Sequence, residues 1–274
     1  MSAPPDNVQR KLLANQNALV TGANSGIGAS IARELAARGA SVVVNYVSHP
    51  ETAQKIVADI NASGGHALAM RADVSREDDV RGMFAQAIKE FGTLDIVVSN
   101  AGIQKDSALI DMTIDEWNAV IGVNLTGAFL CAREAAREFL RRGQRDNSRA
   151  LGKIIFTSSV HQVIPWAGHV NYASTKGGIM LLMKSIAQEL APKKIRVNAI
   201  APGAIKTPIN HDAWATPQAE DALLKLIPCG RVGEPIDIAK VAAWLASDES
   251  DYLYGTTIFV DGGMTLYPGF ATGG

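Results

Sequence analysis

The chain has 274 residues, of which 47% are hydrophobic and 19% charged, a balance typical of a globular protein with a substantial core. Its 26 basic and 27 acidic side chains leave a net charge of -1, so neither nucleic acid nor an anionic membrane is indicated as a partner. With no signal-peptide core and no apolar run near the ~20 residues that span a bilayer, we expect a soluble, cytoplasmic protein. Cys131 and Cys229 match no metal or redox spacing, so we expect buried, reduced thiols and no metal site.

Seven short β-rich runs alternate with helical patterns along the chain. The runs are NALVT (17–21), SVVVNY (41–46), HALAMRA (66–72), LDIVVS (94–99), GKIIFTS (152–158), IRVNAI (195–200) and TTIFVD (256–261). Between them apolar residues recur at helical spacing, as Ile27, Ile31 and Leu35 do. Strands separated by helices require crossovers, and near-continuous hydrophobicity is typical of strands buried on both faces. We therefore expect one α/β domain over residues 1–274, with a doubly wound, parallel, seven-stranded sheet and helices on both faces.

Three segments lie outside this alternation. Residues 1–15 form a short N-terminal extension, and the polar stretch 141–152 is expected to be an exposed helix end and loop. The region from about 202 to 235 is rich in proline and follows a predicted strand. Because loops at the carboxyl ends of parallel strands bind the ligands of such folds, we predict an irregular, mobile cover over the substrate.

The first run is followed at once by a glycine-rich turn and a helical pattern, in ALVTGANSGIGASIARELAARG. Gly22 permits a tight turn, while Gly26 and Gly28 let a pyrophosphate and the sheet approach the backbone. Phosphate oxygens would meet the amides and positive dipole of the helix that starts near Ile27. Strand, turn and helix together predict a Rossmann-type dinucleotide site that includes Asn24, Ser25 and Ile27.

The form TGANSGIG resembles the short-chain dehydrogenase/reductase family. SNAG (99–102), VNLTG (123–127), YASTK (172–176), APG (201–203) and DGG (261–263) follow in that family's order, so the resemblance spans about residues 15–265. It implies an adenine contact at Asp73, although Asp73 also suits the N-cap of the following helical pattern. The further cofactor contacts that it implies are Val74, Asn100, Ala101, Gly102, Tyr172, Lys176, Pro202, Gly203, Ile205 and Thr207.

The residues after the second run bear on the choice between NAD and NADP. The acid expected ~20 residues past the glycines is absent, and Asn45 and Tyr46 stand at the strand end. Val47, Ser48 and His49 follow, so there is also no arginine to clamp a 2′-phosphate. We expect NADP and NAD both to be accepted, with Asn45, Tyr46 and Ser48 among the contacts.

Tyr172 and Lys176 are four residues apart at the start of a helical pattern, which puts both side chains on one face. An ammonium nearby lowers the pKa of a tyrosine from its usual ~10, so Tyr172 is expected to act as general acid and base. Ser159, just past a strand, can hydrogen-bond the substrate oxygen, and Asn124 matches the family residue that supports the lysine through a proton relay. This set implies hydride transfer. A serine hydrolase with His161 as base is disfavoured, because no G-x-S-x-G elbow is present.

The segments SSVHQVIPW, TPIN, VGEP, AAWLAS and VDGGMTLYPGF resemble the bacterial glucose 1-dehydrogenases of this family. The resemblance implies oxidation of D-glucose at C1 to gluconolactone. The expected sugar contacts are Gln104, Ser159, His161, Gln162, Tyr172 and Asn210. Trp166 could stack on a sugar face or pack against its loop.

Two alternatives stay open. One is a carbonyl or 3-oxoacyl reductase of the same family, which would use NADPH and have a more apolar pocket. The other is a non-catalytic NAD(P)-binding regulatory protein, against which the intact Asn124, Ser159, Tyr172 and Lys176 argue. The helix from Asn171 and the helix through Cys131 carry so many apolar residues that we expect a partner subunit to cover them, in a homotetramer.

Overall fold

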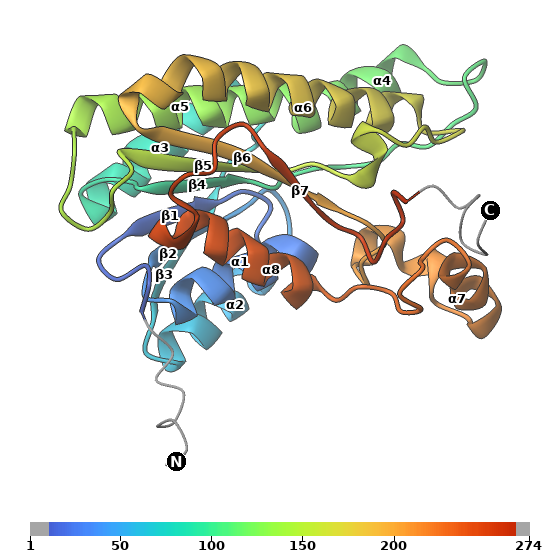
Figure 1. Ribbon diagram of the computed structural model, residues 1–274, viewed down its shortest axis with the longest axis horizontal. Helices are drawn as coiled ribbons and strands as arrows, with labels where there is room; N and C mark the ends of the chain where they lie inside the picture. Colours follow the sequence, from blue (N-terminus) through green and yellow to red (C-terminus); the bar gives the residue numbers. More distant parts are fainter. Residues whose placement is uncertain (1–10, 267–274) are drawn as a thin grey trace.

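The structure is a computed structural model and describes residues 11–266. Its centre is a sheet of seven parallel strands in the order β3-β2-β1-β4-β5-β6-β7 (Figure 1). The strands are β1 (Asn17–Val20), β2 (Ser41–Tyr46), β3 (His66–Arg71), β4 (Ile96–Ser99), β5 (Gly152–Thr157), β6 (Ile195–Pro202) and β7 (Thr257–Val260). The predicted doubly wound parallel sheet is confirmed.

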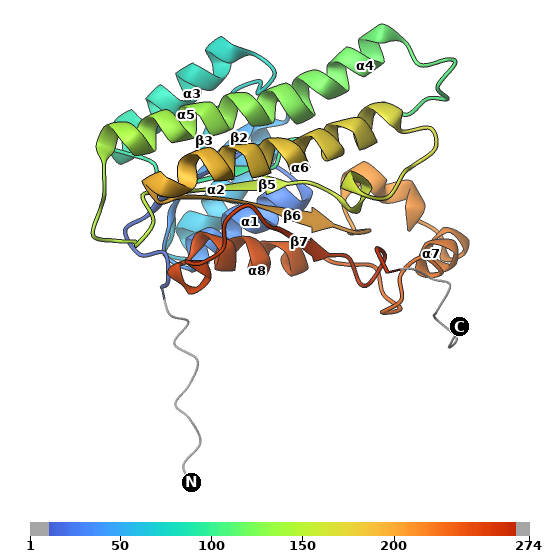
Figure 2. The ribbon, with the colours of Figure 1, turned by 45° about the horizontal axis from the view of Figure 1, so that its top comes forward.

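Helices cover both faces of the sheet (Figures 1 and 2). One face carries α1 (Gly26–Ala37), α2 (Pro50–Ala62) and α8 (Pro235–Ala246), and the other carries α3 (Glu77–Phe91), α4 (Ile114–Ile121), α5 (Gly127–Arg142) and α6 (Val170–Leu190). Each layer has its own apolar core: Leu35 and Ile238 belong to the first, Phe139 and Met183 to the second. Because both sides of the sheet are covered, its inner strands are apolar almost throughout.

The strand order reverses between β1 and β4, which are direct neighbours. The chain after β1 crosses to β2 on one side, and the chain after β4 crosses to β5 on the other. Loops that leave two such strands diverge and open a crevice at their carboxyl ends, where open α/β sheets bind ligands. The chain leaves β1 at Thr21 for the glycine turn, and it leaves β4 at Asn100, within the SNAG segment, at this same point.

Two of the segments outside the strand and helix alternation contain more ordered structure than the sequence pattern indicates. Residues 1–10 of the predicted extension lie outside the described part, but Leu13 is fully buried in the core and its N–H donates to the Arg38 carbonyl (2.9 Å). The region 202–235 contains a short 3₁₀ segment, η4 (Pro208–Ala213), and helix α7 (Pro217–Leu224). Helix α7 begins where the sequence allows it, since Pro217 occupies the first turn and Thr216 Oγ1 accepts from Ala219 N (3.2 Å).

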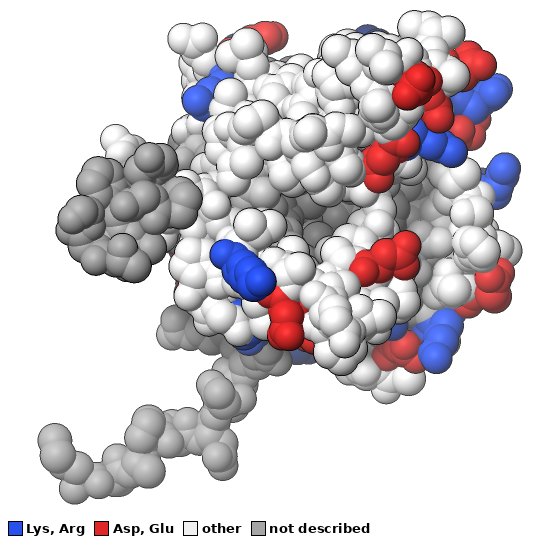
Figure 3. All heavy atoms as spheres, turned by 90° about the vertical axis from the view of Figure 1, so that its right-hand side faces the viewer, with Lys and Arg blue, Asp and Glu red and all other residues white. Residues whose placement is uncertain are grey.

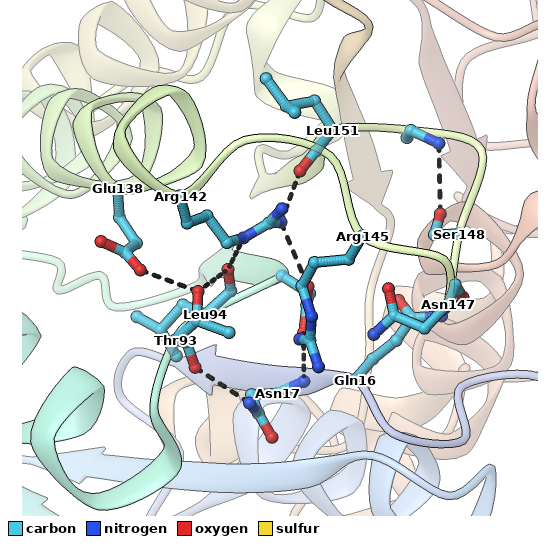
Figure 4. Close-up of polar contacts among 12 residues, drawn as sticks. Gln16, Asn17, Thr93, Leu94, Glu138, Arg142, Arg145, Asn147, Ser148 and Leu151 are labelled. Carbon is cyan, nitrogen blue, oxygen red and sulfur yellow. Dashed lines mark hydrogen bonds and ion pairs between the residues drawn. The ribbon is translucent and has the colours of Figure 1, made fainter.

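The polar stretch 141–152 is anchored to the amino ends of the strands, opposite the crevice (Figure 4). The Arg142 side chain is only 7% exposed and donates to the carbonyls of Leu94 (3.1 Å) and Leu151 (2.5 Å). Arg145 pairs with Asp95 at 2.5 Å. The prediction of an exposed helix end is therefore wrong for Arg142, because carbonyls at buried strand starts need donors that a polar loop can supply.

Helices α4 and α5 are joined by one π-helical turn, η1 (Gly122–Thr126), into a continuous helix from Ile114 to Arg142. This helix is long and apolar enough to cross a membrane, but many core helices of soluble proteins have the same length and composition. Its inner side is packed into the second core through Leu130, Ala135 and Phe139. Cys131 lies on the same side, and burial raises its pKa to about 12. Cys229 is exposed, so the prediction of two buried thiols is wrong for it.

Candidate active site

A cavity of about 1630 Å³ opens at the carboxyl ends of the strands. Typical small-molecule sites measure ~300–1,000 Å³, so this one has room for a dinucleotide and a second molecule together. The predicted site residues that line it are Gly22, Asn24, Ser25, Gly26, Ile27, Gly28, Asn45, Ser48, Asp73, Val74, Asn100, Ala101, Gly102, Gln104, Ser159, His161, Tyr172, Lys176, Pro202, Gly203, Ile205, Thr207 and Asn210. Tyr46, Asn124 and Gln162 are not among its lining residues.

The glycine turn is built so that only glycine fits at two of its positions. Gly22 has a φ of +58°, and a Cβ on it would lie 2.9 Å from Ala101 Cα. A Cβ on Gly28 would lie 2.3 Å from the Gly22 carbonyl oxygen and 2.5 Å from Asn100 Nδ2. Ser25, at the N-cap of α1, makes no side-chain cap hydrogen bond, so the first amides of the helix have no capping side chain. Bare backbone beside an uncapped helix start fits the pyrophosphate of NAD(P).

Asn45 braces the strand ends beside this turn. Its Oδ1 accepts from Gly22 N (3.1 Å), and its Nδ2 donates to the Ala72 carbonyl (3.0 Å) and the Met70 carbonyl (3.3 Å). The side chain is 1% exposed, so its amide is engaged with backbone and not free for a ribose. Asn45 thus shapes the adenosine end of the cavity by holding the glycine turn against β2 and β3.

Asp73 lines the cavity in an Asx turn. Its Oδ1 accepts from Ser75 N (2.9 Å) and Ser75 Oγ (2.7 Å). Helix α3 begins at Glu77 with Arg76 as its N-cap, so the interpretation of Asp73 as a helix cap is wrong. The turn fixes the carboxylate at the edge of the cavity, where the predicted adenine contact would lie.

A guanidinium that the sequence analysis missed lies near the same end. Arg71, the last residue of β3, donates from Nε to the carbonyl of Val47 (3.3 Å), and Val47 lines the cavity. Arg71 is 24 residues further along the chain than Val47, so no local pattern after β2 indicates it. The register that pairs Tyr46 with Arg71 brings the charge there from the neighbouring strand.

Ser159, Tyr172 and Lys176 meet at the centre of the cavity. Ser159 follows β5 at the start of the short 3₁₀ segment η2 (Val160–Gln162), and its Oγ accepts from His161 N (3.2 Å). Since that bond uses a lone pair, the hydroxyl proton remains available to a substrate oxygen. Tyr172 lies in the first turn of α6, and Lys176 Nζ lies 5.3 Å from the Tyr172 ring centroid while donating to the Thr157 carbonyl (3.0 Å).

The pKa of Tyr172 differs from the expectation. Burial raises the pKa of the phenol, and hydrogen bonds with Ser159 and Gln104 offset only part of that rise. Burial also lowers the pKa of Lys176 to about 8. The predicted lowering of the Tyr172 pKa is therefore wrong, because burial penalises both the phenolate and the ammonium.

Asn124 lies beneath the cavity, in the π turn η1, where it is 1% exposed. Its Nδ2 donates to the Ile103 carbonyl (3.0 Å) and Thr175 Oγ1 (3.3 Å), and its Oδ1 accepts from Ile103 N (2.8 Å). These bonds tie the segment after β4 to helix α6 next to Tyr172 and Lys176. A π turn at such a position is typical of functional sites.

The residues predicted to hold a sugar are mostly engaged elsewhere. His161 Nδ1 lies 3.1 Å from the Ile164 carbonyl, and burial lowers the pKa of its ring, which favours the neutral form. Asn210 Oδ1 accepts from Thr207 N (3.2 Å), Thr207 Oγ1 (2.8 Å) and Trp214 Nε1 (3.3 Å). Gln162 is 9% exposed and does not line the cavity. Gln104, like Ser159, lies close enough to Tyr172 to hydrogen-bond its hydroxyl, which lowers the pKa of the phenol.

The chain resembles characterised proteins along nearly its whole length. It is 49% identical to 3beta-hydroxysteroid dehydrogenase 1 of Eggerthella lenta, over 95% of this chain and 98% of that protein. It is 41% identical to glucose 1-dehydrogenase 2 of Bacillus subtilis, over 94% and 98%. With a 3-oxoacyl-[acyl-carrier-protein] reductase of Staphylococcus aureus the identity is 43%, over 92% and 98%.

Solved structures agree with the fold. A short-chain type dehydrogenase/reductase from Mycobacterium marinum has a TM-score of 0.87 at 36% identity, covering 96% of this chain and 100% of that one. A gluconate 5-dehydrogenase from Burkholderia cenocepacia, in complex with NADP and tartrate, has the same TM-score at 34% identity and the same coverage. The model of the family described as enoyl-(acyl carrier protein) reductase matches residues 22–265. The chain therefore belongs to the short-chain dehydrogenase/reductase family of NAD(P)-dependent oxidoreductases.

Proposed function

We propose that this chain interconverts a secondary hydroxyl and a ketone on a bulky, mainly apolar substrate of the 3-hydroxysteroid type. The observation that carries the proposal is the apolar lining of the cavity around Tyr172, which includes Ile103, Val160, Ile164, Ile209, Leu226 and Leu266. Figure 3 shows this face of the molecule: the atoms around the central hollow are mostly uncharged, with a few charged side chains at its rim. The 49% identity to a 3beta-hydroxysteroid dehydrogenase supports the same substrate class.

Each catalytic side chain has a role that its contacts suit. A nicotinamide cofactor bound along the glycine turn supplies the hydride acceptor for oxidation and the donor for reduction. The Tyr172 hydroxyl exchanges a proton with the substrate oxygen, and Ser159 donates a second hydrogen bond to that oxygen. Lys176 favours the phenolate electrostatically, and Asn124 holds α6 in register with the segment after β4.

D-Glucose is the second candidate, with oxidation at C1 to gluconolactone. It is favoured by the resemblance of the SSVHQVIPW segment and by the 41% identity to a glucose 1-dehydrogenase. A polyol needs several polar groups that converge on it. His161 Nδ1 and Asn210 Oδ1 are already used by protein groups, and Gln162 does not line the cavity, so these three residues offer a polyol only His161 Nε2 and Asn210 Nδ2. This count of available donors and acceptors is why we rank glucose below the apolar substrate.

We further propose that both NADP and NAD serve as cofactors. No carboxylate side chain lines the cavity at the end of β2, so a 2′-phosphate meets no carboxylate there. Arg71, held against Val47, is placed to attract that phosphate, although it is exposed and its contribution is small. A related structure contains NADP, which is consistent with use of the phosphorylated cofactor.

A substrate panel tests the function. We would assay four substrates with NAD(H) and with NADP(H), following the absorbance of the reduced nicotinamide. They are a 3β-hydroxysteroid, the corresponding 3-ketosteroid, D-glucose and a 3-oxoacyl thioester. We expect kcat/KM for the steroid pair to exceed the others by at least about 100-fold, which corresponds to roughly 3 kcal/mol of apolar contact. A preference for glucose assigns the second candidate, and a preference for the thioester assigns a 3-oxoacyl reductase; either overturns the steroid proposal.

A homotetramer is the assembly we propose. Phe129 and Leu140 on α5 are 43% and 48% exposed, and Leu181 on α6 is 63% exposed, on the sides of these helices away from the sheet. Apolar side chains on two adjacent helices suit burial by a second copy of the chain. Light scattering at micromolar concentration should give four times the mass of 29.0 kDa, and a monomer would contradict the proposal.

A further inference from the structure

Three rings form a stack beside the catalytic tyrosine. The Trp166 indole lies parallel to His161, with centroids 4.2 Å apart and 16° between the planes, and parallel to His169, with centroids 3.5 Å apart and 6° between the planes. Two imidazoles this close to one indole centroid would overlap if they shared a face. They must therefore lie on opposite faces, so both faces of Trp166 are covered.

His169 is held in place at both ring nitrogens. Nε2 lies 3.2 Å from Asp106 Oδ2, and Nδ1 lies 2.9 Å from the Ala167 carbonyl oxygen. Both partners are oxygen atoms, so the two contacts fix the plane and the orientation of the imidazole ring.

Few titratable side chains of residues 11–266 contact the three stacked rings. Asp106 is the carboxylate that faces His169, while His161 and Tyr172 are the other titratable groups against the indole. The Lys105 ammonium interacts with Glu116.

Hydrogen bonds join the stretch of chain that carries the stack to the segment that carries Asp106, so that the two form one wall. Ser107 N donates to the Gly168 carbonyl (3.0 Å), and Asn171 Nδ2 donates to the Lys105 carbonyl (2.8 Å). The contact between His169 Nε2 and Asp106 Oδ2 adds a link between two side chains of the same segments. Trp166 lines the cavity from this wall at 83° to the Tyr172 ring, with centroids 6.2 Å apart.

We propose that His169 is a positioning residue: by stacking on the indole while anchored to Asp106, it holds Trp166 in the pocket wall and so sets the substrate shape accepted beside Tyr172. Trp166 then offers the substrate an edge and not a face. The expectation that it could stack on a sugar does not fit this arrangement. This role of His169 rests on the proposed function in one respect only, which is that the preferred substrate is taken to be bulky and apolar.

The test uses His169→Ala and His169→Phe in the full-length enzyme. His169→Ala should raise KM for the preferred substrate about tenfold and leave kcat within about twofold of the wild-type value. It should also lower the ratio of kcat/KM for that substrate to kcat/KM for a small cyclic alcohol. His169→Phe keeps a flat ring on the indole, and it should restore KM to within about threefold of the wild type. Acrylamide quenching of tryptophan emission, which needs no substrate, should increase in the alanine variant and not in the phenylalanine variant.

His211→Ala is the matched control, because the His211 ring also packs against a tryptophan, Trp214, with ring centroids 4.8 Å apart, but Trp214, unlike Trp166, does not line the cavity. It should leave KM unchanged. Unchanged KM and quenching in a folded His169→Ala, a loss confined to kcat, or failure of His169→Phe to rescue would each overturn the role of His169. If the wild type prefers glucose, the proposed function fails, yet the quenching and the KM measured with glucose still test the stack.

Discussion

Substitution of Gly28 by alanine should damage both the fold and the cofactor site. The new Cβ would lie 2.3 Å from the Gly22 carbonyl oxygen, 2.5 Å from Asn100 Nδ2 and 3.0 Å from Ala23 Cα. Real Cβ atoms do not approach backbone so closely, so the glycine turn or Asn100 must move. Asn100 Nδ2 donates to the carbonyls of Thr21 (3.0 Å) and Gly22 (3.2 Å), and displacing it breaks both bonds.

The magnitude follows from these contacts. Each lost hydrogen bond costs about 1 kcal/mol, and forced overpacking costs about 1–3 kcal/mol. Alanine is favoured over glycine in a helix by ~1 kcal/mol, which offsets part of the loss. We expect the free energy of unfolding to fall by about 2–4 kcal/mol and the Kd for NADPH, measured by its fluorescence, to rise at least about tenfold.

Gly82→Ala is the control, because Gly82 lies inside α3 and a Cβ there meets nothing within 4 Å. It should stabilise the protein by up to ~1 kcal/mol in urea unfolding and leave NADPH binding unchanged. If Gly28→Ala matches Gly82→Ala in both stability and NADPH affinity, the close-approach argument for the glycine turn is wrong.

Three further predictions concern the site. Tyr172→Phe should lower kcat about 100- to 10,000-fold while the Kd for NADPH stays within about twofold, because only the proton donor is lost; near-normal turnover would remove Tyr172 from the mechanism. In ketone reduction, kcat/KM should fall as pH rises through about 8, where Lys176 loses its charge while Tyr172, with its raised pKa, keeps its proton; a flat profile to pH 9.5 would contradict this. Arg71→Met should raise KM for NADPH about two- to fivefold and leave KM for NADH unchanged, and equal effects on both cofactors would exclude a 2′-phosphate contact.

Local pattern was sufficient for much of the architecture. The seven apolar runs predict the strands, and the helical spacing of residues such as Ile31 and Leu35 predicts the helices, because the pattern of buried side chains in each element is visible in neighbouring residues. The glycine turn and the four-residue spacing of Tyr172 and Lys176 are equally local, so their elements and mutual proximity could be predicted. The cavity then places most of the predicted cofactor contacts together.

What the sequence could not decide depends on contacts between distant segments. Whether a polar side chain is free depends on its partners. The Asn45 side chain bonds four backbone groups, and Asn210 Oδ1 accepts from Thr207 and Trp214. The Tyr172 pKa depends on how tightly the protein encloses the ring, which spacing to Lys176 does not reveal.

The sequence by itself thus determined the sheet, the dinucleotide turn and the candidate proton donor, because each is specified by residues near one another in the chain. Only the tertiary structure decided which polar groups remain open to a substrate and how Trp166 is clamped between His161 and His169. It also brought Arg71 beside the β2 loop, through the pairing of β2 with β3. The physical reason is that strand register and loop packing set those contacts, and both arise only when the whole chain has folded.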